Sequence, residues 1–269
     1  MVMLNHPVQV YPHKLRRLYW PFLGLAENCR EIIGTVAGSF KWDKDRRYTI
    51  PRFTFLGPQG PTAQKRIGIF ALVHGDEPAG AEALLKLLQT LAGHPELARN
   101  YDLVCYPVCN PTGYEDGTRP NRFGVDLNRE FWRGSEQPEV RILEQELRTQ
   151  AFDGIIALHA DDTSEGLYGY AHDRLLNEQL LAPALRASER LLPRDCRNLI
   201  DGFAARDGIL DDCFEGVLAP PPEQKPRPFE IIFETPAHAS ADRQAEAAHA
   251  ALLAIIAEYR GFLAWGQDI

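Results

Sequence analysis

Short apolar runs alternate with amphipathic segments along most of the chain. Residues 67–73 are apolar throughout and follow Lys65-Arg66, a pattern typical of a strand buried on both faces. Residues 154–158 repeat this pattern, and residues 229–233 repeat it apart from Glu230. Further strands are expected at 48–56 and 101–108, and helices at 79–93, 138–149, 174–192 and 241–259. Strands that alternate with helices at this spacing predict crossover connections and a mostly parallel sheet.

This order of elements predicts an α/β fold, with a mixed, mostly parallel central sheet flanked by helices. The 269 residues are enough for one domain of this kind, and we interpret 1–269 as a single domain. Residues 1–45 are expected to form an N-terminal arm that packs on it. The proline run at 220–222 is interpreted as a loop, because a strand and a helix still follow it.

Composition and charge exclude several classes of protein. The net charge of −8 and the absence of a long basic run argue against a nucleic-acid partner. No apolar window is long enough for a membrane span, and Lys14, Arg16 and Arg17 interrupt the start of the chain, unlike a signal peptide. Five scattered cysteines without CxxC spacing indicate free thiols in a reducing compartment. We therefore expect a cytoplasmic protein, whose oligomeric state the sequence leaves unknown.

An imidazole and a carboxylate follow the 67–73 strand directly, in His74-Gly75-Asp76-Glu77. The next residues read as the start of a helix, which places His74 and Glu77 at the carboxyl end of a core strand, where open α/β sheets bind ligands. Histidine and glutamate are two of the three protein ligands that a catalytic zinc ion needs. Without further ligands, the four residues also fit an ordinary helix start that favours acidic groups.

Two other core strands end in polar groups of the same kind. His159 follows 154–158, and it completes a His₂Glu set with an open fourth position if the strands are neighbours. Glu234 follows 229–233, where a carboxylate suits general-base work and proton delivery to a leaving amine. Taken alone, His159 also fits a histidine bonded to a loop backbone, and Glu234 a helix N-terminal acid. Three such strand ends in one chain favour a site.

The loop between residues 110 and 129 adds positive charge. Arg119, Arg122 and Arg129 carry planar guanidinium groups that suit carboxylates or a developing oxyanion. Solvation at the surface is the alternative interpretation. Asn128 beside Arg129, after an apolar pair, is interpreted as an anchoring pair for a carboxylate.

At these positions the sequence resembles the zinc carboxypeptidase family, which comprises carboxypeptidase A-like metallopeptidases with their aspartoacylase and succinylglutamate desuccinylase relatives. The resemblance covers about residues 65–240, with the motifs in the same order. The matching motifs are His74-Gly75-Asp76-Glu77, Asn110-Pro111-Thr112-Gly113-Tyr114, Arg119-Pro120-Asn121, Gly124-Val125-Asp126-Leu127-Asn128-Arg129-Glu130-Phe131, Leu158-His159 and Glu234-Thr235-Pro236.

The resemblance implies the zinc carboxypeptidase-like, phosphorylase/hydrolase-like fold and assigns roles to these residues. One zinc ion would be held by His74, Glu77 and His159, and Glu234 would serve as general base and acid. Arg119 would polarise the scissile carbonyl and steady the oxyanion. The implied activity is hydrolysis by a metallocarboxypeptidase, that is, proteolysis of a small peptide or peptide-like substrate.

Asn128 and Arg129 would hold the free carboxylate of that substrate.

Two departures from the family pattern leave the shape of the rest of the pocket undetermined. Family carboxypeptidases place a mobile tyrosine upstream of the catalytic glutamate, but residues 208–214 contain none. Tyr168 or Tyr170 could reach the site from another loop. The segment that shapes the side-chain pocket falls near 215–228 and does not align, so side-chain preference stays open.

Three functions remain in competition. The leading hypothesis is a metallocarboxypeptidase-type amide hydrolase, for which cell-wall peptides are one substrate class. The alternative is an N-acyl-amino-acid deacylase of the aspartoacylase or succinylglutamate desuccinylase type. Those relatives carry an extra domain after the catalytic glutamate, whereas 35 residues follow Glu234 here, which favours the peptidase. The third hypothesis is a noncatalytic binding protein, although none of the expected metal ligands and catalytic bases is missing from this sequence.

Asp76, Asp161 and Asp162 lie beside the expected ligands. They would either bind a second ion or, as we prefer, orient the histidines.

Overall fold

Ten strands form one sheet in the part of the chain that the computed structural model describes, which is residues 12–42, 46–60 and 63–265. The strands are β1 (Ile32–Lys41), β2 (Arg47–Leu56), β3 (Lys65–Phe70), β4 (Tyr101–Tyr106), β5 (Gly154–Asp161), β6 (Tyr168–Ala171), β7 (Leu199–Ile200), β8 (Phe203–Arg206), β9 (Ile209–Leu210) and β10 (Phe229–Pro236). They lie in the order β1-β2-β4-β3-β5-β10-β6-β9-β8-β7.

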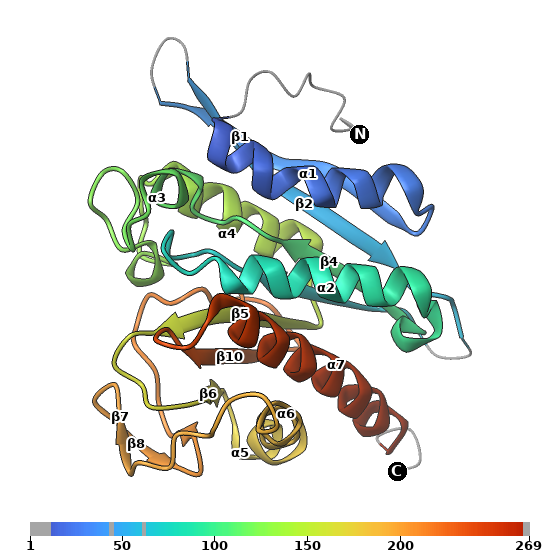
Figure 1. The fold of residues 1–269 in the computed structure, drawn as a ribbon. Helices are drawn as coiled ribbons and strands as arrows, with labels where there is room; N and C mark the ends of the chain where they lie inside the picture. The colour runs from blue at the N-terminus through green and yellow to red at the C-terminus, as the bar shows by residue number, and fades with distance from the viewer. Residues whose placement is uncertain (1–11, 43–45, 61–62, 266–269) are drawn as a thin grey trace.

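Helices connect these strands. They are α1 (His13–Asn28), α2 (Ala79–Gly93), α3 (Pro111–Asp116), α4 (Pro138–Gln150), α5 (Arg174–Leu176), α6 (Ala182–Ser188) and α7 (Ala241–Trp265), with the short helical turns η2 (Pro95–Ala98), η3 (Leu127–Arg129) and η4 (Asn177–Leu181). Figure 1 shows α1, α2 and α7 lying across one face of the sheet. Among the described residues, no helix has both the length and the apolar character that crossing a membrane requires.

The centre of the sheet is parallel, and this arrangement gathers the candidate residues. Strands β4, β3, β5 and β10 run side by side in the same direction, whereas the outer pairs β1–β2, β2–β4 and β10–β6 are antiparallel. The carboxyl ends of β3, β5 and β10 therefore meet at one edge, where His159 and Glu234 are register partners. The prediction of a mixed sheet flanked by helices is confirmed, and the mostly parallel pairing that was expected holds for its centre.

Both faces of the sheet are covered, which explains why its central strands are mainly apolar. Ile67 and Ile69 of β3 belong to a core shared with α2 and α7. Phe70 points into a second core, where it packs with Val140 and Leu143 of α4. Alternate residues of β3 thus contact opposite helix layers, as expected for a strand buried on both faces.

The structure differs from the predicted elements where local backbone chemistry overrides the apolar pattern. The strand predicted at 67–73 ends at Phe70, since Leu72 adopts a left-handed conformation with φ 52°. The 101–108 strand ends before Pro107, which has no N–H for a ladder. The helix predicted at 174–192 is divided into α5, a π-helical turn at η4 and α6.

The predicted N-terminal arm contains, within its described residues, α1 and the edge strand β1. This strand pairs along its length with β2, from Ile32 opposite Phe55 to Lys41 opposite Arg47. Three side chains of this segment suggested that it packs on the rest of the chain: Phe22 is buried in the core beside the sheet and Leu23 packs against that core, whereas Trp20 is 61% exposed. The segment thus packs on the core through α1 and joins the sheet through β1.

A tight hairpin that the sequence analysis did not predict joins β7 to β8. Its turn is Asp201-Gly202, and both residues have positive φ, 50° and 84°. This is the conformation of a two-residue turn of type I′, which Asp-Gly favours because glycine carries no Cβ. The same Asp-Gly pair was a usable signal in the sequence. The hairpin matters for function because its turn lies beside the candidate site.

One buried carboxyl group gives a test of the fold that is independent of activity. Glu230 of β10 is only 3% exposed, and burial raises its pKa from 4.5 to about 7 despite the opposing charge of Arg227 at 3.4 Å. Between about pH 4.5 and pH 7 the folded state therefore keeps a proton on Glu230 that the unfolded chain has lost. The contribution of Glu230 to the free energy of unfolding falls as pH rises through this range. Glu230→Gln is expected to leave the free energy of unfolding nearly unchanged at about pH 5 and to raise it by about 1–3 kcal/mol at about pH 8. Urea unfolding at the two pH values measures this; equal effects at both would contradict it.

Candidate active site

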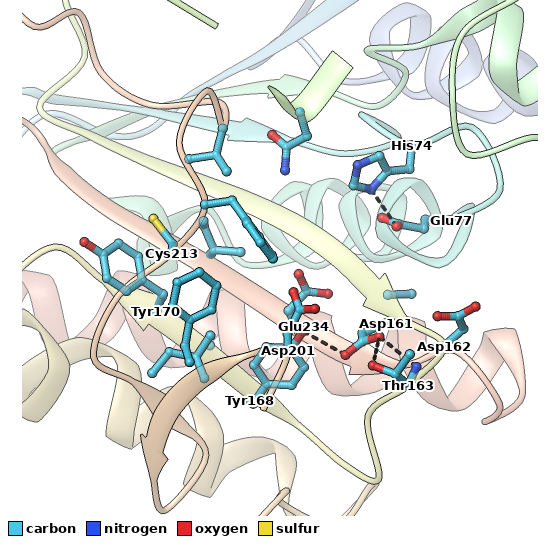
Figure 2. Close-up of a pocket in the computed structure, with 18 of the residues that line it drawn as sticks. His74, Glu77, Asp161, Asp162, Thr163, Tyr168, Tyr170, Asp201, Cys213 and Glu234 are labelled. Carbon is cyan, nitrogen blue, oxygen red and sulfur yellow. Dashed lines mark hydrogen bonds and ion pairs between the residues drawn. The ribbon is translucent and has the colours of Figure 1, made fainter. Parts of the chain in front are cut away.

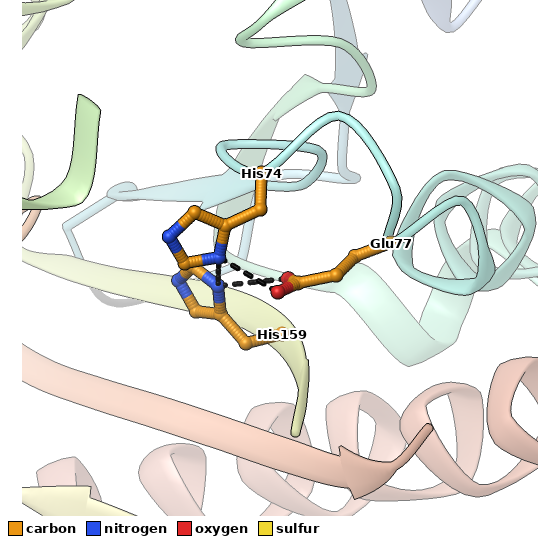
Figure 3. Close-up of side chains that lie close together, drawn as sticks. All are labelled: His74, Glu77 and His159. Carbon is orange, nitrogen blue, oxygen red and sulfur yellow. Dashed lines mark hydrogen bonds and ion pairs between the residues drawn. The ribbon is translucent and has the colours of Figure 1, made fainter. Parts of the chain in front are cut away.

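Two histidines and one glutamate converge at the carboxyl edge of the parallel strands (Figure 3). His74 Nδ1 lies 2.7 Å from Glu77 Oε1, and His159 Nδ1 lies 3.0 Å from Glu77 Oε2. The two Nδ1 atoms are 3.2 Å apart, and ligand atoms of all three residues lie within 4.8 Å of one another. All three side chains are buried. This compact set of two imidazoles and one carboxylate fits a zinc ion by its donor chemistry.

The backbone around His74 explains how the sequence builds this corner. After the left-handed residue Leu72, the chain turns and delivers His74 and Glu77 to the end of the sheet, just before α2 begins. Gly75 permits the turn, because a Cβ there would lie 2.0 Å from the backbone carbon of Gly113. The Gly75 N–H donates to the Arg119 carbonyl at 3.2 Å, which ties the metal-ligand loop to the arginine loop.

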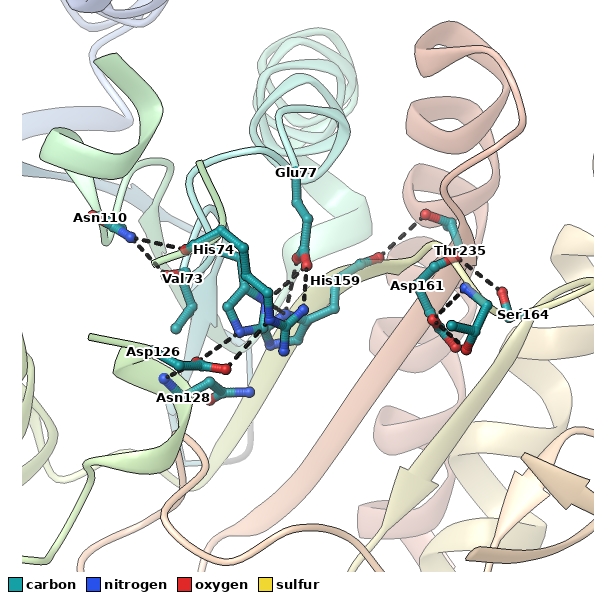
Figure 4. Close-up of polar contacts among 12 residues, drawn as sticks. Val73, His74, Glu77, Asn110, Asp126, Asn128, His159, Asp161, Ser164 and Thr235 are labelled. Carbon is teal, nitrogen blue, oxygen red and sulfur yellow. Dashed lines mark hydrogen bonds and ion pairs between the residues drawn. The ribbon is translucent and has the colours of Figure 1, made fainter. Parts of the chain in front are cut away.

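A third carboxylate, Asp126, orients His74 from the side opposite Glu77 (Figure 4). Its Oδ1 lies 3.1 Å from His74 Nε2, and its Oδ2 accepts from Arg119 Nε at 3.3 Å. Burial opposes ionisation of Asp126, but the hydrogen bond and charge of His74 hold its pKa below the usual value. From the sequence, Asp76, Asp161 and Asp162 were expected to orient the histidines. That expectation was wrong for His74, because the loop of residues 117–126 folds back over it.

The protonation of the cluster is consistent with a cation site. Burial disfavours a charged His74, yet the charge of Glu77 and the hydrogen bond to Asp126 raise its pKa to about 9. Burial likewise disfavours the charged form of Glu77, but the two histidines lower its pKa. Burial lowers the pKa of His159, whose Nε2 is buried without a hydrogen-bond partner among the described residues. A positive charge is thus stabilised between His74 and Glu77, and a metal ion would take the place of the proton.

Glu234 lies on the neighbouring strand and does not belong to the three-residue cluster. It is half-buried at the end of β10, opposite His159 in register, and lines the same cavity as His74 and Glu77. Burial, followed by the charges of Glu77 and Asp161, raises its pKa well above the usual value. A carboxylate whose charge is disfavoured in this way has a high affinity for a proton, which general-base chemistry requires.

The cavity has a volume of about 240 Å³ and combines a polar end with an apolar end (Figure 2). His74 and Glu77 lie at one end, whereas Tyr170 and Cys213 lie at the other. Arg119 also lines the cavity, with its Nη1 3.6 Å from Glu77. The remaining lining residues are Asn128, Arg129, Ala160, Asp161, Asp162, Thr163, Tyr168, Gly169, Asp201, Phe203, Leu210, Phe214, Val217, Ile232 and Glu234. Polar side chains and charged side chains of both signs line this cavity beside an apolar wall, an arrangement that suits a polar small molecule or a peptide.

The arginines of the 110–129 loop divide into two groups. Arg119 and Arg129 line the cavity. Arg122 does not, because its guanidinium is held by Asp116, with Nε to Oδ2 at 2.7 Å, and by Glu115 at 2.9 Å. Of the three arginines that the sequence offered for anion binding, two are therefore in a position to contact a substrate.

Asn128 and Arg129, the expected carboxylate anchors, both reach the cavity. The side-chain oxygen of Asn128 accepts from the Leu218 N–H at 2.9 Å. The NH₂ group of Asn128 is therefore the part of this side chain that can donate to a substrate. Arg129 Nη1 donates to the Asn128 carbonyl at 2.8 Å. The two side chains together offer donors of the kind that bind a carboxylate.

The structure places both candidate tyrosines on the cavity wall. Tyr168 is the register partner of Glu234 and donates its hydroxyl to Asp161 Oδ2 at 2.9 Å, and Tyr170 lies two register positions further along, opposite Ile232. The segment 208–214, where the family pattern calls for a tyrosine, contributes Cys213 and Phe214 to the same wall.

Comparison with known proteins agrees with this geometry. Residues 63–193 match the model of the succinylglutamate desuccinylase/aspartoacylase catalytic domain. Murein peptide amidase A of Escherichia coli K12 is 40% identical over 81 residues, which are 28% of this chain and 31% of that protein. Carboxypeptidase SOL1 of Arabidopsis thaliana is 32% identical over 103 residues, or 32% of this chain and 21% of that protein. The matches thus span less than a third of the length of these relatives.

Solved structures share the fold over most of the chain. A Shewanella denitrificans protein assigned as a metallopeptidase has a TM-score of 0.75 at 23% identity, with 90% of this chain and 89% of that chain covered. A metallo-carboxypeptidase from Burkholderia cenocepacia has a TM-score of 0.71 at 17% identity, with coverage of 94% and 70%. A succinylglutamate desuccinylase from Silicibacter has a TM-score of 0.57 at 19% identity, with coverage of 84% and 66%. At these identities the structural likeness concerns the fold.

Proposed function

We propose that this chain, whose residues 63–193 match the succinylglutamate desuccinylase/aspartoacylase catalytic domain, is a zinc-dependent amide hydrolase of the zinc carboxypeptidase-like family that releases a residue with a free carboxylate from a peptide or peptide-like substrate. One observation carries the proposal. His74 and Glu77 line one cavity together with Glu234, Arg119, Asn128 and Arg129. His159, the third member of the cluster, lies 3.0 Å from Glu77.

His74, Glu77 and His159 would hold the zinc ion, which supplies Lewis acidity toward water and the scissile carbonyl. Glu234 accepts a proton from the attacking water and then delivers it to the leaving amine, so one carboxyl group serves both steps. Asp126 keeps the His74 ring oriented and its Nδ1 directed at the cluster.

Arg119 has the electrostatic task. Its Nε is bonded to Asp126 at 3.3 Å and its Nη1 lies 3.6 Å from Glu77, so the guanidinium is fixed at the border of the cluster. From there it would steady the negative charge that develops on the carbonyl oxygen as the amide is attacked. A preoriented cation serves this purpose well because it need not reorganise during the reaction.

Asn128 and Arg129 would hold the carboxylate of the residue that is released. This anchoring would make the enzyme an exopeptidase in character, because a blocked carboxyl group leaves the guanidinium without its partner. Cell-wall peptides are the substrate class that we favour, because the Escherichia coli protein that is 40% identical over 81 residues is named a murein peptide amidase.

An N-acyl-amino-acid deacylase would use the same residues on a different acyl group, and the matched domain model includes such enzymes. A substrate screen separates the two. Purified, zinc-loaded protein is offered short peptides and muropeptides on one side, and N-acetyl and N-succinyl amino acids on the other. We expect amino-acid release from the first group; cleavage confined to the second group would replace the peptidase proposal with the deacylase.

A further inference from the structure

The loop between β9 and β10 is docked onto the segment that contains the expected carboxylate anchors. The Leu218 N–H donates to the Asn128 side chain at 2.9 Å, and the Phe131 N–H donates to the Gly216 carbonyl at 3.0 Å. Gly216 has φ 77°, and a Cβ there would lie 2.3 Å from the Arg129 carbonyl oxygen. Position 216 thus requires glycine both for its conformation and for close backbone approach, which indicates a fixed contact between the two segments.

Within this contact, Phe214 lies against the guanidinium of Arg129. The distance from Arg129 Cζ to the ring centroid is 4.0 Å, well inside the range of a cation–π interaction. The ring of Phe203, from the β7–β8 hairpin, packs edge-on against Phe214 with centroids 4.8 Å apart and an interplanar angle of 79°. Phe203 and Phe214 both line the cavity, so the hairpin supports the aromatic ring that contacts Arg129.

This contact leaves most of the guanidinium available. Among the described residues, the Arg129 side chain donates one hydrogen bond, which runs from Nη1 to the Asn128 carbonyl. A guanidinium has five N–H donors, and stacking on an aromatic ring uses its face while its edge keeps the donors. An arginine side chain that is otherwise free has much rotamer entropy to lose when it binds a ligand, and a ring on one side reduces that loss.

We propose that Phe214 is a positioning residue that holds Arg129 toward the cavity and thereby sets the preference for substrates with a free carboxylate. The inference rests on the proposed function, since it takes Arg129 as the carboxylate anchor. Phe214 occurs in the 208–214 segment, where the expected tyrosine is missing, and it has no hydroxyl to donate. Its effect therefore passes through Arg129 and not through a hydrogen bond to the substrate.

The test compares one peptide with a free carboxylate and the same peptide as its carboxamide. Phe214→Leu keeps an apolar side chain but removes the aromatic face, and it is expected to raise KM for the free acid about three- to tenfold with kcat within about twofold of the wild type. The carboxamide kinetics should not change, which shows that the site is intact. Phe214→Tyr should restore the wild-type KM. Phe123→Leu, the same change at an exposed ring outside the cavity, is the matched control.

The double variant with Phe214→Leu and Arg129→Gln distinguishes the proposed carboxylate anchor from the positioning role of Phe214. If Phe214 acts through Arg129, Phe214→Leu adds no further loss in the Arg129→Gln background. A wild-type enzyme without preference for the free acid would overturn the carboxylate anchor and this inference with it. If Arg129→Gln removes the preference and Phe214→Leu leaves it intact, the anchor stands and the role of Phe214 is refuted.

Discussion

Replacement of Glu234 by Gln is expected to lower kcat for amide hydrolysis by about 100- to 10,000-fold while the protein keeps its metal. The amide side chain has nearly the same shape but cannot accept the proton of the attacking water. Glu234 lies outside the three-residue cluster, so the ligand set is unchanged. Amino-acid release measures kcat, and elemental analysis of the same sample measures the metal.

Glu230→Gln is a matched control for this variant. It makes the same substitution in the same strand, at a buried glutamate that does not line the cavity. It should retain both zinc and hydrolysis. Substantial turnover by the Glu234→Gln protein would remove Glu234 from the mechanism, whereas loss of metal from that protein would make Glu234 a ligand.

Replacement of His159 by Ala is expected to weaken zinc binding by more than about 100-fold and to abolish hydrolysis. Partners that merely orient a ligand contribute about 10- to 100-fold, and loss of a ligand itself should exceed this effect. The buried Glu77 would keep only one imidazole partner, His74. Zinc competition with a chromophoric chelator measures the affinity.

Thermal unfolding gives a second readout that does not depend on activity. A ligand that binds the folded state alone raises its stability, so zinc should raise the Tm of the wild type but not of the His159→Ala protein. His172→Ala, at an exposed histidine outside the cavity, is the control and should behave as wild type. Retention of one zinc per chain by the His159→Ala protein would show that His159 is not a ligand.

The sequence predicted the parts of the fold that depend on short-range pattern. The runs 154–158 and 229–233, apolar except for Glu230, are strands because both faces of the sheet are covered, and each ends where a polar side chain must reach solvent or a site. The adjacency of β3, β5 and β10 was an assumption, because strand order depends on how helices cross over the sheet and no local pattern encodes it. The structure supplies that adjacency, and the roles of the residues gathered there stay predictions.

What the sequence did not predict depends on long loops and on context. Asp126 reaches His74 only because its loop returns to the sheet, although its place two residues before Asn128, within the 124–131 motif of the family resemblance, was a signal. Asp201-Gly202 signalled a hairpin that was overlooked, and Phe214 gained meaning only once Arg129 was placed beside it. The single-domain boundary, the cytoplasmic location and the single zinc ion stay predictions.

The most direct test of the account is the rate at which the carboxyl-terminal residue is released from a free-carboxylate peptide, before metal removal, after it, and after zinc is restored. We expect hydrolysis to be lost with the metal and to return in proportion to zinc, reaching its maximum at one ion per chain. Full hydrolysis by the metal-depleted protein, or no amide cleavage by the zinc-loaded protein, would contradict the proposal that this cluster is the catalytic centre of an amide hydrolase.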